Sequence, residues 1–222
     1  MTQPTALDNF LDKWRERWPE WPVVETFVPA AQRELVLAWF ALLQEFEDAM
    51  NIAGDPLPAD AKLGWWSEEL RDWSRQRSRH PLGRLLEPRT APWDDLAEAL
   101  PVLGALREPW PDTDTAFLRM QPLANAIAGI EAALFGGRGD AATTRAIAAQ
   151  WLSTRVLGAG QGNDLAVLLE RWPARIPSAS LPRRLWASLA RGRVQSRARF
   201  GDKPQRISRL RLLWRGWNAA RG

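Results

Sequence analysis

Residues 29–51 read PAAQRELVLAWFALLQEFEDAMN, and this stretch decides how the rest of the chain can fold. Its large apolar side chains recur at intervals of three and four, which predicts a helix with one broad apolar face. The positions on that face are Leu35, Trp39, Leu42, Leu43, Phe46 and Met50. A neighbouring stripe holds Phe40, Gln44, Glu47 and Asn51, with Asp48 beside it. We therefore expect Glu47, Asp48 and Asn51 to converge near the end of this helix.

A second helix is predicted to begin near Asp60, after a break rich in proline and glycine at 54–58. Leu63, Trp66, Leu70 and Trp73 follow the helical period, and Trp65, Glu69 and Asp72 form the stripe beside them. An arginine-rich turn then leads to His80 and Pro81. Because Pro81 disfavours helix at His80 and suits a first helical turn, a further helix is predicted from there to Leu86.

Composition points to one helical domain. With 222 residues and 45% hydrophobic content, the chain can bury one substantial core, and no linker divides residues 1–222. No strand-period alternation of any length occurs, so we expect an all-α, single-domain bundle of seven to nine helices. The absence of cysteine excludes disulfides and thiolate metal sites. No 18-residue apolar run and no apolar leader occur, so we expect a cytoplasmic protein without a membrane span.

Charge divides the chain unevenly. Residues 1–170 hold 16 basic and 25 acidic side chains, whereas residues 171–222 hold 14 basic side chains and only Asp202 as an acid. This basic C-terminal helical segment, 171–222, indicates an anionic partner: a phospholipid surface, a diphosphate or a nucleic acid. A solvated arginine-rich face that offsets the acidic front is the alternative. Recognition motifs for nucleic acid are absent, so an anionic membrane surface, with peripheral association, ranks above nucleic acid.

Several short motifs occur in a characteristic order. They are Arg33, the run 38–42 (AWFAL), the acidic end of the first helix, the run 62–66 (KLGWW), Glu69 and His80-Pro81-Leu82. In this order and spacing the chain resembles the squalene/phytoene synthase family. The resemblance covers about 60 residues and implies the isoprenoid synthase fold, isoprenoid diphosphate ligands and Mg²⁺ held by two aspartate-rich motifs on facing helices. It suggests substrate-binding roles for Arg33, Phe40, Gln44, Trp65, Glu69 and Arg155.

The chain departs from the family pattern at both motifs. The first, D-D-x-x-D, falls on Glu47, Asp48 and Asn51, our candidate metal ligands, so the third carboxylate is replaced by an amide. The second, D-x-x-x-D, should fall within 150–177, where we find no suitable carboxylate pair. Since Mg²⁺ prefers carboxylate and phosphate oxygens, we expect reduced or lost prenyltransferase activity with retained binding of an isoprenoid or lipid.

Two alternatives stay open. The first is an active head-to-head prenyl diphosphate synthase that uses Mg²⁺ with Glu47 and Asp48, with arginines, or carboxylates from a partner protein, in place of the second motif. The second is a membrane-surface or assembly adaptor acting through segment 171–222, since the same family resemblance extends to proteins that act in respiratory-complex assembly.

Overall fold

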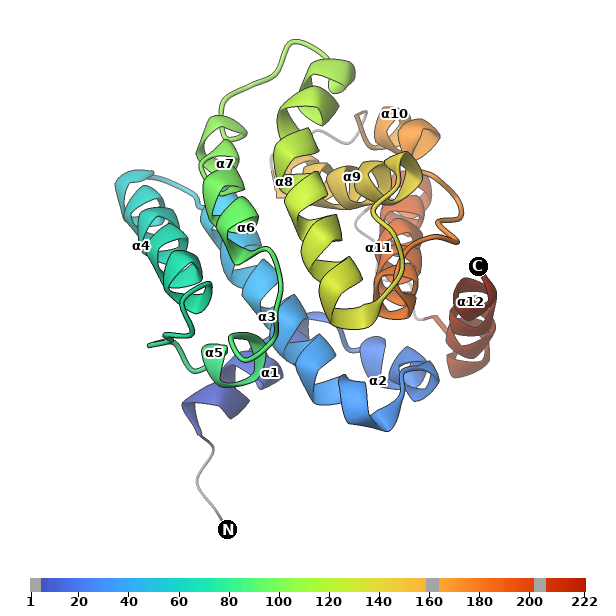
Figure 1. Ribbon diagram of the computed structural model, residues 1–222. Coiled ribbons are helices and arrows are strands. Elements are labelled where there is room, and N and C mark those ends of the chain that lie inside the picture. The colour runs from blue at the N-terminus through green and yellow to red at the C-terminus, as the bar shows by residue number, and fades with distance from the viewer. Residues whose placement is uncertain (1–4, 159–163, 202–206) are drawn as a thin grey trace.

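The computed structural model describes residues 5–158, 164–201 and 207–222, and these ranges fold into helices without any strand (Figure 1). The predicted all-α bundle is thereby confirmed. The longer helices are α1 (Ala6–Arg17), α3 (Arg33–Met50), α4 (Leu57–Trp73), α8 (Thr113–Phe135), α9 (Ala141–Gly158), α11 (Leu181–Phe200) and α12 (Arg209–Arg221). The shorter ones are α2 (Trp21–Val24), α5 (Gly83–Leu86), α6 (Trp93–Ala99), α7 (Val102–Ala105) and α10 (Asp164–Arg171).

The described helices outnumber the seven to nine expected. Three of them, α2, α5 and α7, are single turns of four residues. Proline accounts for two of these interruptions, because Pro22 lies in the first turn of α2 and Pro101 directly precedes α7. Proline is tolerated in the first turn of a helix but breaks a helix interior. It therefore divides a stretch that its periodicity alone would predict to be one helix.

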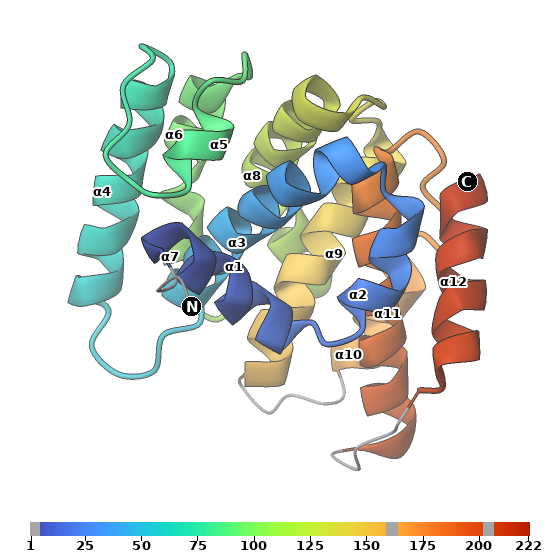
Figure 2. The same ribbon diagram turned by 90° about the horizontal axis from the view of Figure 1, so that it is seen from below.

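Helix α3 runs through the middle of the bundle and contacts α1, α4, α5, α7 and α9 (Figures 1 and 2). Its residues are buried without interruption from Leu35 to Glu47. The predicted apolar face is correct, but the neighbouring stripe with Phe40, Gln44 and Glu47 is buried as well. The polar side chains near its C-terminal end therefore lie inside the protein.

Tryptophan fills the interfaces around α3. Trp14, Trp21 and Trp186 surround the ring of Phe40, whose centroid lies 4.2 Å from that of Trp186. On another side of α3, Trp66, Trp73 and Trp93 form a chain of edge-to-face contacts. Aromatic pairs in these arrangements stabilise the folded protein by more than the burial of their apolar area alone, which explains how short helices pack firmly here.

The basic segment forms the outer flank of the bundle. Helix α11 packs against α9 and α10, and α12 lies outside it against α11 and α2 (Figure 2). Gly216 of α12 permits close packing against the segment that follows α2, because a Cβ on Gly216 would lie 2.8 Å from the ring of Phe27. Among the residues described, no helix combines the length and apolar character that crossing a bilayer requires.

Candidate functional site

The carboxylates at the end of α3 lie in a network of basic side chains from α1 and α4. Lys13 Nζ lies 2.8 Å from a carboxylate oxygen of Glu45 and 2.8 Å from one of Asp48. Arg17 Nη1 lies 2.7 Å from Asp48, and Lys62 Nζ lies 2.6 Å from Glu45. Burial alone would raise the pKa of Asp48, but Lys13 and Arg17 outweigh it and lower the pKa. Asp48 is therefore an ionised, ion-paired carboxylate at neutral pH.

Glu47 has the opposite character. Burial raises the pKa of its carboxyl to about 7, although Arg17, whose Nη1 lies 3.4 Å away, opposes the shift. The neighbouring charge of Asp48 adds to the increase. Near neutral pH this group is consequently divided between its protonated and ionised forms, so it can both donate and accept a proton.

Asn51 joins the end of α3 to α9. Its Nδ2 donates to the backbone oxygen of Glu47 and to Thr154 Oγ1, both at 3.1 Å. Its Oδ1 is buried without a hydrogen-bond partner. An unpartnered buried acceptor is costly, so Asn51 Oδ1 is a natural contact for a ligand donor or an ordered water.

A cavity of about 310 Å³ opens between α3 and α9, with α1 and α11 completing its walls. Its polar lining consists of Arg17, Glu47, Asn51, Gln150, Ser153, Thr154 and Arg193, and its apolar lining of Trp18, Leu157, Ala190 and Val194. The mixture suits an amphiphilic ligand, because polar side chains from α1, α3, α9 and α11 and apolar side chains from α9 and α11 line the same space. We call this the α3/α9 cavity.

Three of its polar residues, Gln150, Ser153 and Thr154, were not predicted from the sequence, because uncharged side chains do not mark a magnesium site. Gln150 and Thr154 are four residues apart, so they share one face of α9. The sequence does place Gln150, Ser153 and Thr154 within five positions of one predicted helix, and Gln150 and Ser153 are buried in the structure. The four-residue spacing of Gln150 and Thr154 equals that of the two aspartates in the D-x-x-x-D pattern, but neither side chain is a carboxylate.

The donor set of the α3/α9 cavity does not fit a magnesium cluster. Glu47 is the only carboxylate among the described residues that line it, and Arg17 and Arg193 bring positive charge to the same space. Gln150 Oε1 already accepts from Arg183 Nη1 at 3.0 Å. Mg²⁺ needs near-octahedral oxygen coordination, usually with carboxylates and substrate phosphates, which these residues do not offer.

The six residues expected to bind substrate lie elsewhere, since none of them lines the α3/α9 cavity. Phe40 and Gln44 are buried in the core. Arg33 Nε donates to the backbone oxygen of Val28 at 3.1 Å, and Arg155 Nη2 donates to that of Arg107 at 2.8 Å. These two arginines hold turns in place.

Glu69 and Trp65 form a separate group at the end of α4. Glu69 is completely buried and accepts from Trp73 Nε1, from Arg79 Nε, and from the backbone nitrogens of Arg79 and His80. Trp65 is partly exposed, stands edge-on to His80 and has the Arg79 guanidinium 5.8 Å from its ring. This arrangement fixes the turn that leads to Pro81.

Comparison of the chain with models of known protein families, with curated protein sequences and with solved structures gave no match. The resemblance to the squalene/phytoene synthase family stays a prediction from the quoted motifs. The geometry of the α3/α9 cavity and of the basic flank is therefore what indicates a function.

Proposed function

We propose that this chain is a squalene/phytoene synthase-like protein that binds an isoprenoid or lipid in the α3/α9 cavity and has lost most or all prenyltransferase activity. One observation carries the proposal. One polar face, formed by Glu47 of α3 and by Asn51 directly after it, meets a second polar face, formed by Gln150 and Thr154 of α9, across one cavity. Three of these four side chains are amides or a hydroxyl, where the family resemblance implies carboxylates.

The chemistry of those side chains supports binding over catalysis. Ionising an isoprenoid diphosphate requires charge stabilisation at the leaving group, which Mg²⁺ supplies in the family that the sequence resembles. Here Asp48 is held by Lys13 and Arg17, and Glu47 has a pKa of about 7. The polar head of an isoprenoid or lipid can still bond to Glu47 and Asn51 Oδ1, and the guanidinium of Arg17 can bind a phosphate oxygen without a metal.

Calorimetric titration with farnesyl diphosphate tests this proposal. Leu157 is half-buried at the wall of the cavity, so Leu157→Trp should fill it and weaken binding by about tenfold or more. Leu169→Trp is the matched control, because Leu169 is also half-buried but lies on α10, away from the cavity. Unchanged affinity in Leu157→Trp, or absence of binding by the wild type, would refute the proposal.

A second candidate function, peripheral attachment to an anionic membrane, is favoured by the outer face of α12. Leu210, Leu213, Trp214 and Trp217 are spaced as one helical stripe and are between 39% and 79% exposed. Arg209, Arg211 and Arg215 lie on the same helix. A basic helix with exposed tryptophan and leucine is typical of helices that lie in the membrane interface.

Sedimentation with lipid vesicles tests this second function. The wild type should bind vesicles containing phosphatidylserine more strongly than pure phosphatidylcholine, and Leu210→Gln combined with Trp217→Gln should reduce binding. Leu118→Gln is the control, since Leu118 is equally solvent-exposed but lies on α8. Self-association of the wild type, with no binding to either vesicle, would instead assign the stripe to contacts between copies of the chain.

A further inference from the structure

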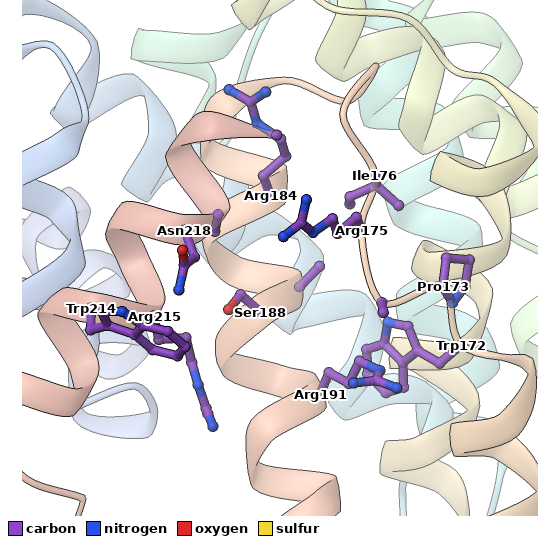
Figure 3. Close-up of a pocket in the computed structure, with 14 residues that line it drawn as sticks. Trp172, Pro173, Arg175, Ile176, Arg184, Ser188, Arg191, Trp214, Arg215 and Asn218 are labelled. Atoms are coloured by element: carbon purple, nitrogen blue, oxygen red, sulfur yellow. The ribbon is translucent and has the colours of Figure 1, made fainter.

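A second pocket of about 150 Å³ lies between the loop at 172–177, α11 and α12 (Figure 3). Among the described residues, four arginines line it, Arg175, Arg184, Arg191 and Arg215, and no aspartate or glutamate side chain does. Figure 3 shows Arg175 extending from the loop toward the two helices, where Ser188 and Asn218 lie. We call this the arginine pocket.

The arginines of this pocket lack the partners that other arginines in the protein have. Arg17, Arg183 and Arg193 all pair with carboxylates. Arg175, Arg191 and Arg215 form no such ion pair within the described residues. Arg191 Nε and Arg215 Nη1 are buried and have no hydrogen-bond partner in the part of the chain that the structure describes. Charged donors left unsatisfied in this way destabilise the protein unless an anion or ordered water meets them.

Arg215 is held in the pocket by a close helix contact. A Cβ on Gly192 of α11 would lie 1.5 Å from Arg215 Nη1, so only glycine leaves room for the guanidinium there. Burial, with the neighbouring charges of Arg211 and Arg191, lowers the pKa of Arg215. Arg191 of α11 and Arg215 of α12 thus line the same pocket although their charges repel.

Arg184 contributes to the frame of the pocket. Its Nη1 donates to the backbone oxygen of Pro177 at 3.3 Å, and its Nη2 donates to that of Ala220 at 3.2 Å. These two bonds connect the loop at 172–177 and the end of α12 to α11. The remaining cations, Arg175, Arg191 and Arg215, can therefore turn toward a shared ligand without loosening the walls.

We propose that the arginine pocket binds a phosphate group. Guanidinium groups bond to phosphate in a bidentate, charge-assisted manner, and two or more of them compensate the double negative charge. Ser188 and Asn218 add neutral donors. Trp172, Ile176 and Trp214 provide apolar walls beside them, which suits a phosphate ester whose organic part is apolar. Either a soluble phosphate ester or the headgroup of an anionic lipid supplies this chemistry.

Calorimetric titration with inorganic phosphate and with a short-chain, soluble phosphatidic acid tests the proposal on the full chain. Arg191→Gln and Arg215→Gln should each weaken binding by about tenfold, the loss expected for one charge-assisted contact. Arg209→Gln removes the same charge from an exposed position of α12 that does not line the pocket, so it should leave the affinity nearly unchanged.

Gly192→Ala separates pocket geometry from net charge. The added methyl group displaces the Arg215 guanidinium, a flexible side-chain end, while every charge is kept. It should weaken phosphate binding about as much as Arg215→Gln. Circular dichroism and thermal unfolding confirm that each variant folds. Equal effects of Arg209→Gln and Arg191→Gln, or unchanged affinity in Gly192→Ala, would overturn the proposal. Either result would indicate that segment 171–222 attracts anions only through a diffuse cationic surface.

Two further arms distinguish the ligand source and the two sites. Tighter binding of the short-chain phosphatidic acid than of inorganic phosphate supports a lipid headgroup, and equal affinities support a soluble phosphate. Leu157→Trp should leave phosphate binding unchanged, because Leu157 lies in the α3/α9 cavity. Absence of phosphate binding would therefore leave the proposal for the α3/α9 cavity standing. Absence of farnesyl diphosphate binding would likewise leave the proposal for the arginine pocket standing.

Discussion

Arg183 of α11 and Glu131 of α8 form a buried ion pair at the centre of the bundle. Arg183 Nε lies 2.8 Å from Glu131 Oε2, and neither side chain has appreciable exposure. Trp39 Nε1 donates to the same carboxylate at 2.8 Å, and Arg183 Nη1 donates to Gln150. The pair thus links α3, α8, α9 and α11 and fixes the orientation of a residue that lines the α3/α9 cavity.

Removing one partner of this pair should destabilise the protein strongly. Arg183→Met leaves the Glu131 carboxylate buried without a cation, and we expect the free energy of unfolding to fall by about 3–5 kcal/mol. Chemical denaturation measures it. Arg183→Met combined with Glu131→Leu should recover part of the loss, because no isolated charge remains. A double variant with the full sum of both single losses would contradict this account.

Glu69 should stabilise the turn before Pro81 in a pH-dependent manner. Burial raises the pKa of Glu69, but the backbone bonds from Arg79 and His80, with those from the Trp73 and Arg79 side chains, lower it below its usual value of 4.5. The stabilisation is present above that value and is lost as the pH falls through the lowered pKa. Glu69→Gln should therefore cost about 2 kcal/mol near neutral pH.

Denaturant titrations at neutral pH and in acid check this expectation. The difference between wild type and Glu69→Gln should narrow in acid, because both proteins then carry an uncharged side chain. Glu68→Gln serves as the control, since Glu68 is the exposed neighbour on α4. A difference that stays constant across the titration would contradict the assignment.

Glu47 should show the reverse dependence on pH. Its pKa rises from 4.5 in the unfolded chain to about 7 in the folded protein. Its contribution to stability is complete below 4.5 and is lost as the pH rises toward 7, since only the unfolded chain then readily loses the proton. Glu47→Gln should be more stable than wild type above neutral pH, by up to about 3 kcal/mol, and equal to it in acid.

Thermal unfolding of wild type and Glu47→Gln across this pH range measures the effect. Asp48→Asn provides a contrast of opposite sign, because the pKa of Asp48 is lowered and its ion pairs stabilise the protein at neutral pH. If Glu47→Gln were destabilising at high pH, the carboxyl would not be the buried, partly protonated group described above.

Gly137 should tolerate alanine less well than its neighbour Gly136. Both have positive φ, +91° and +76°. A Cβ on Gly137 would also lie 2.7 Å from the backbone nitrogen of Ser180, whereas one on Gly136 would meet nothing within 4 Å. Backbone strain alone costs about 1–3 kcal/mol, so Gly137→Ala should lower the free energy of unfolding by more than this amount. Gly136→Ala should lower it by no more than the backbone strain. Equal losses in denaturant titrations would contradict the close contact between the α8–α9 turn and the start of α11.

The helical class and the core face of α3 could be predicted from the sequence, because both follow from local periodicity. Leu35, Trp39 and Phe46 recur at helical spacing and are buried. The helix predicted from Pro81 to Leu86 is present as α5, whereas the single turn α2 was not separated in advance, since a four-residue turn has no period of its own. The burial of Phe40 and Gln44 was also missed, because the number of helices packed around α3 depends on tertiary structure.

The candidate site was predictable only in part. Spacing brings Glu47 and Asn51 onto one side of α3, and both line the α3/α9 cavity. Their partners from α9 were not identified, because Gln150 and Thr154 are 99 and 103 residues away from Asn51 and carry no charge that marks them. The ion pairs of Asp48 with Lys13 and Arg17 likewise depend on how α1 packs across α3.

Thermal unfolding with farnesyl diphosphate, with Mg²⁺ and with a chelator, tests the central claim most directly. A ligand that binds only the folded state raises the melting temperature. We predict a rise of the same size with and without Mg²⁺, retained in Asp48→Asn relative to that variant's own baseline, because the side chains of the α3/α9 cavity bind the ligand without a metal. A rise that requires Mg²⁺ and disappears in Asp48→Asn would contradict the account and identify the end of α3 as a working metal site.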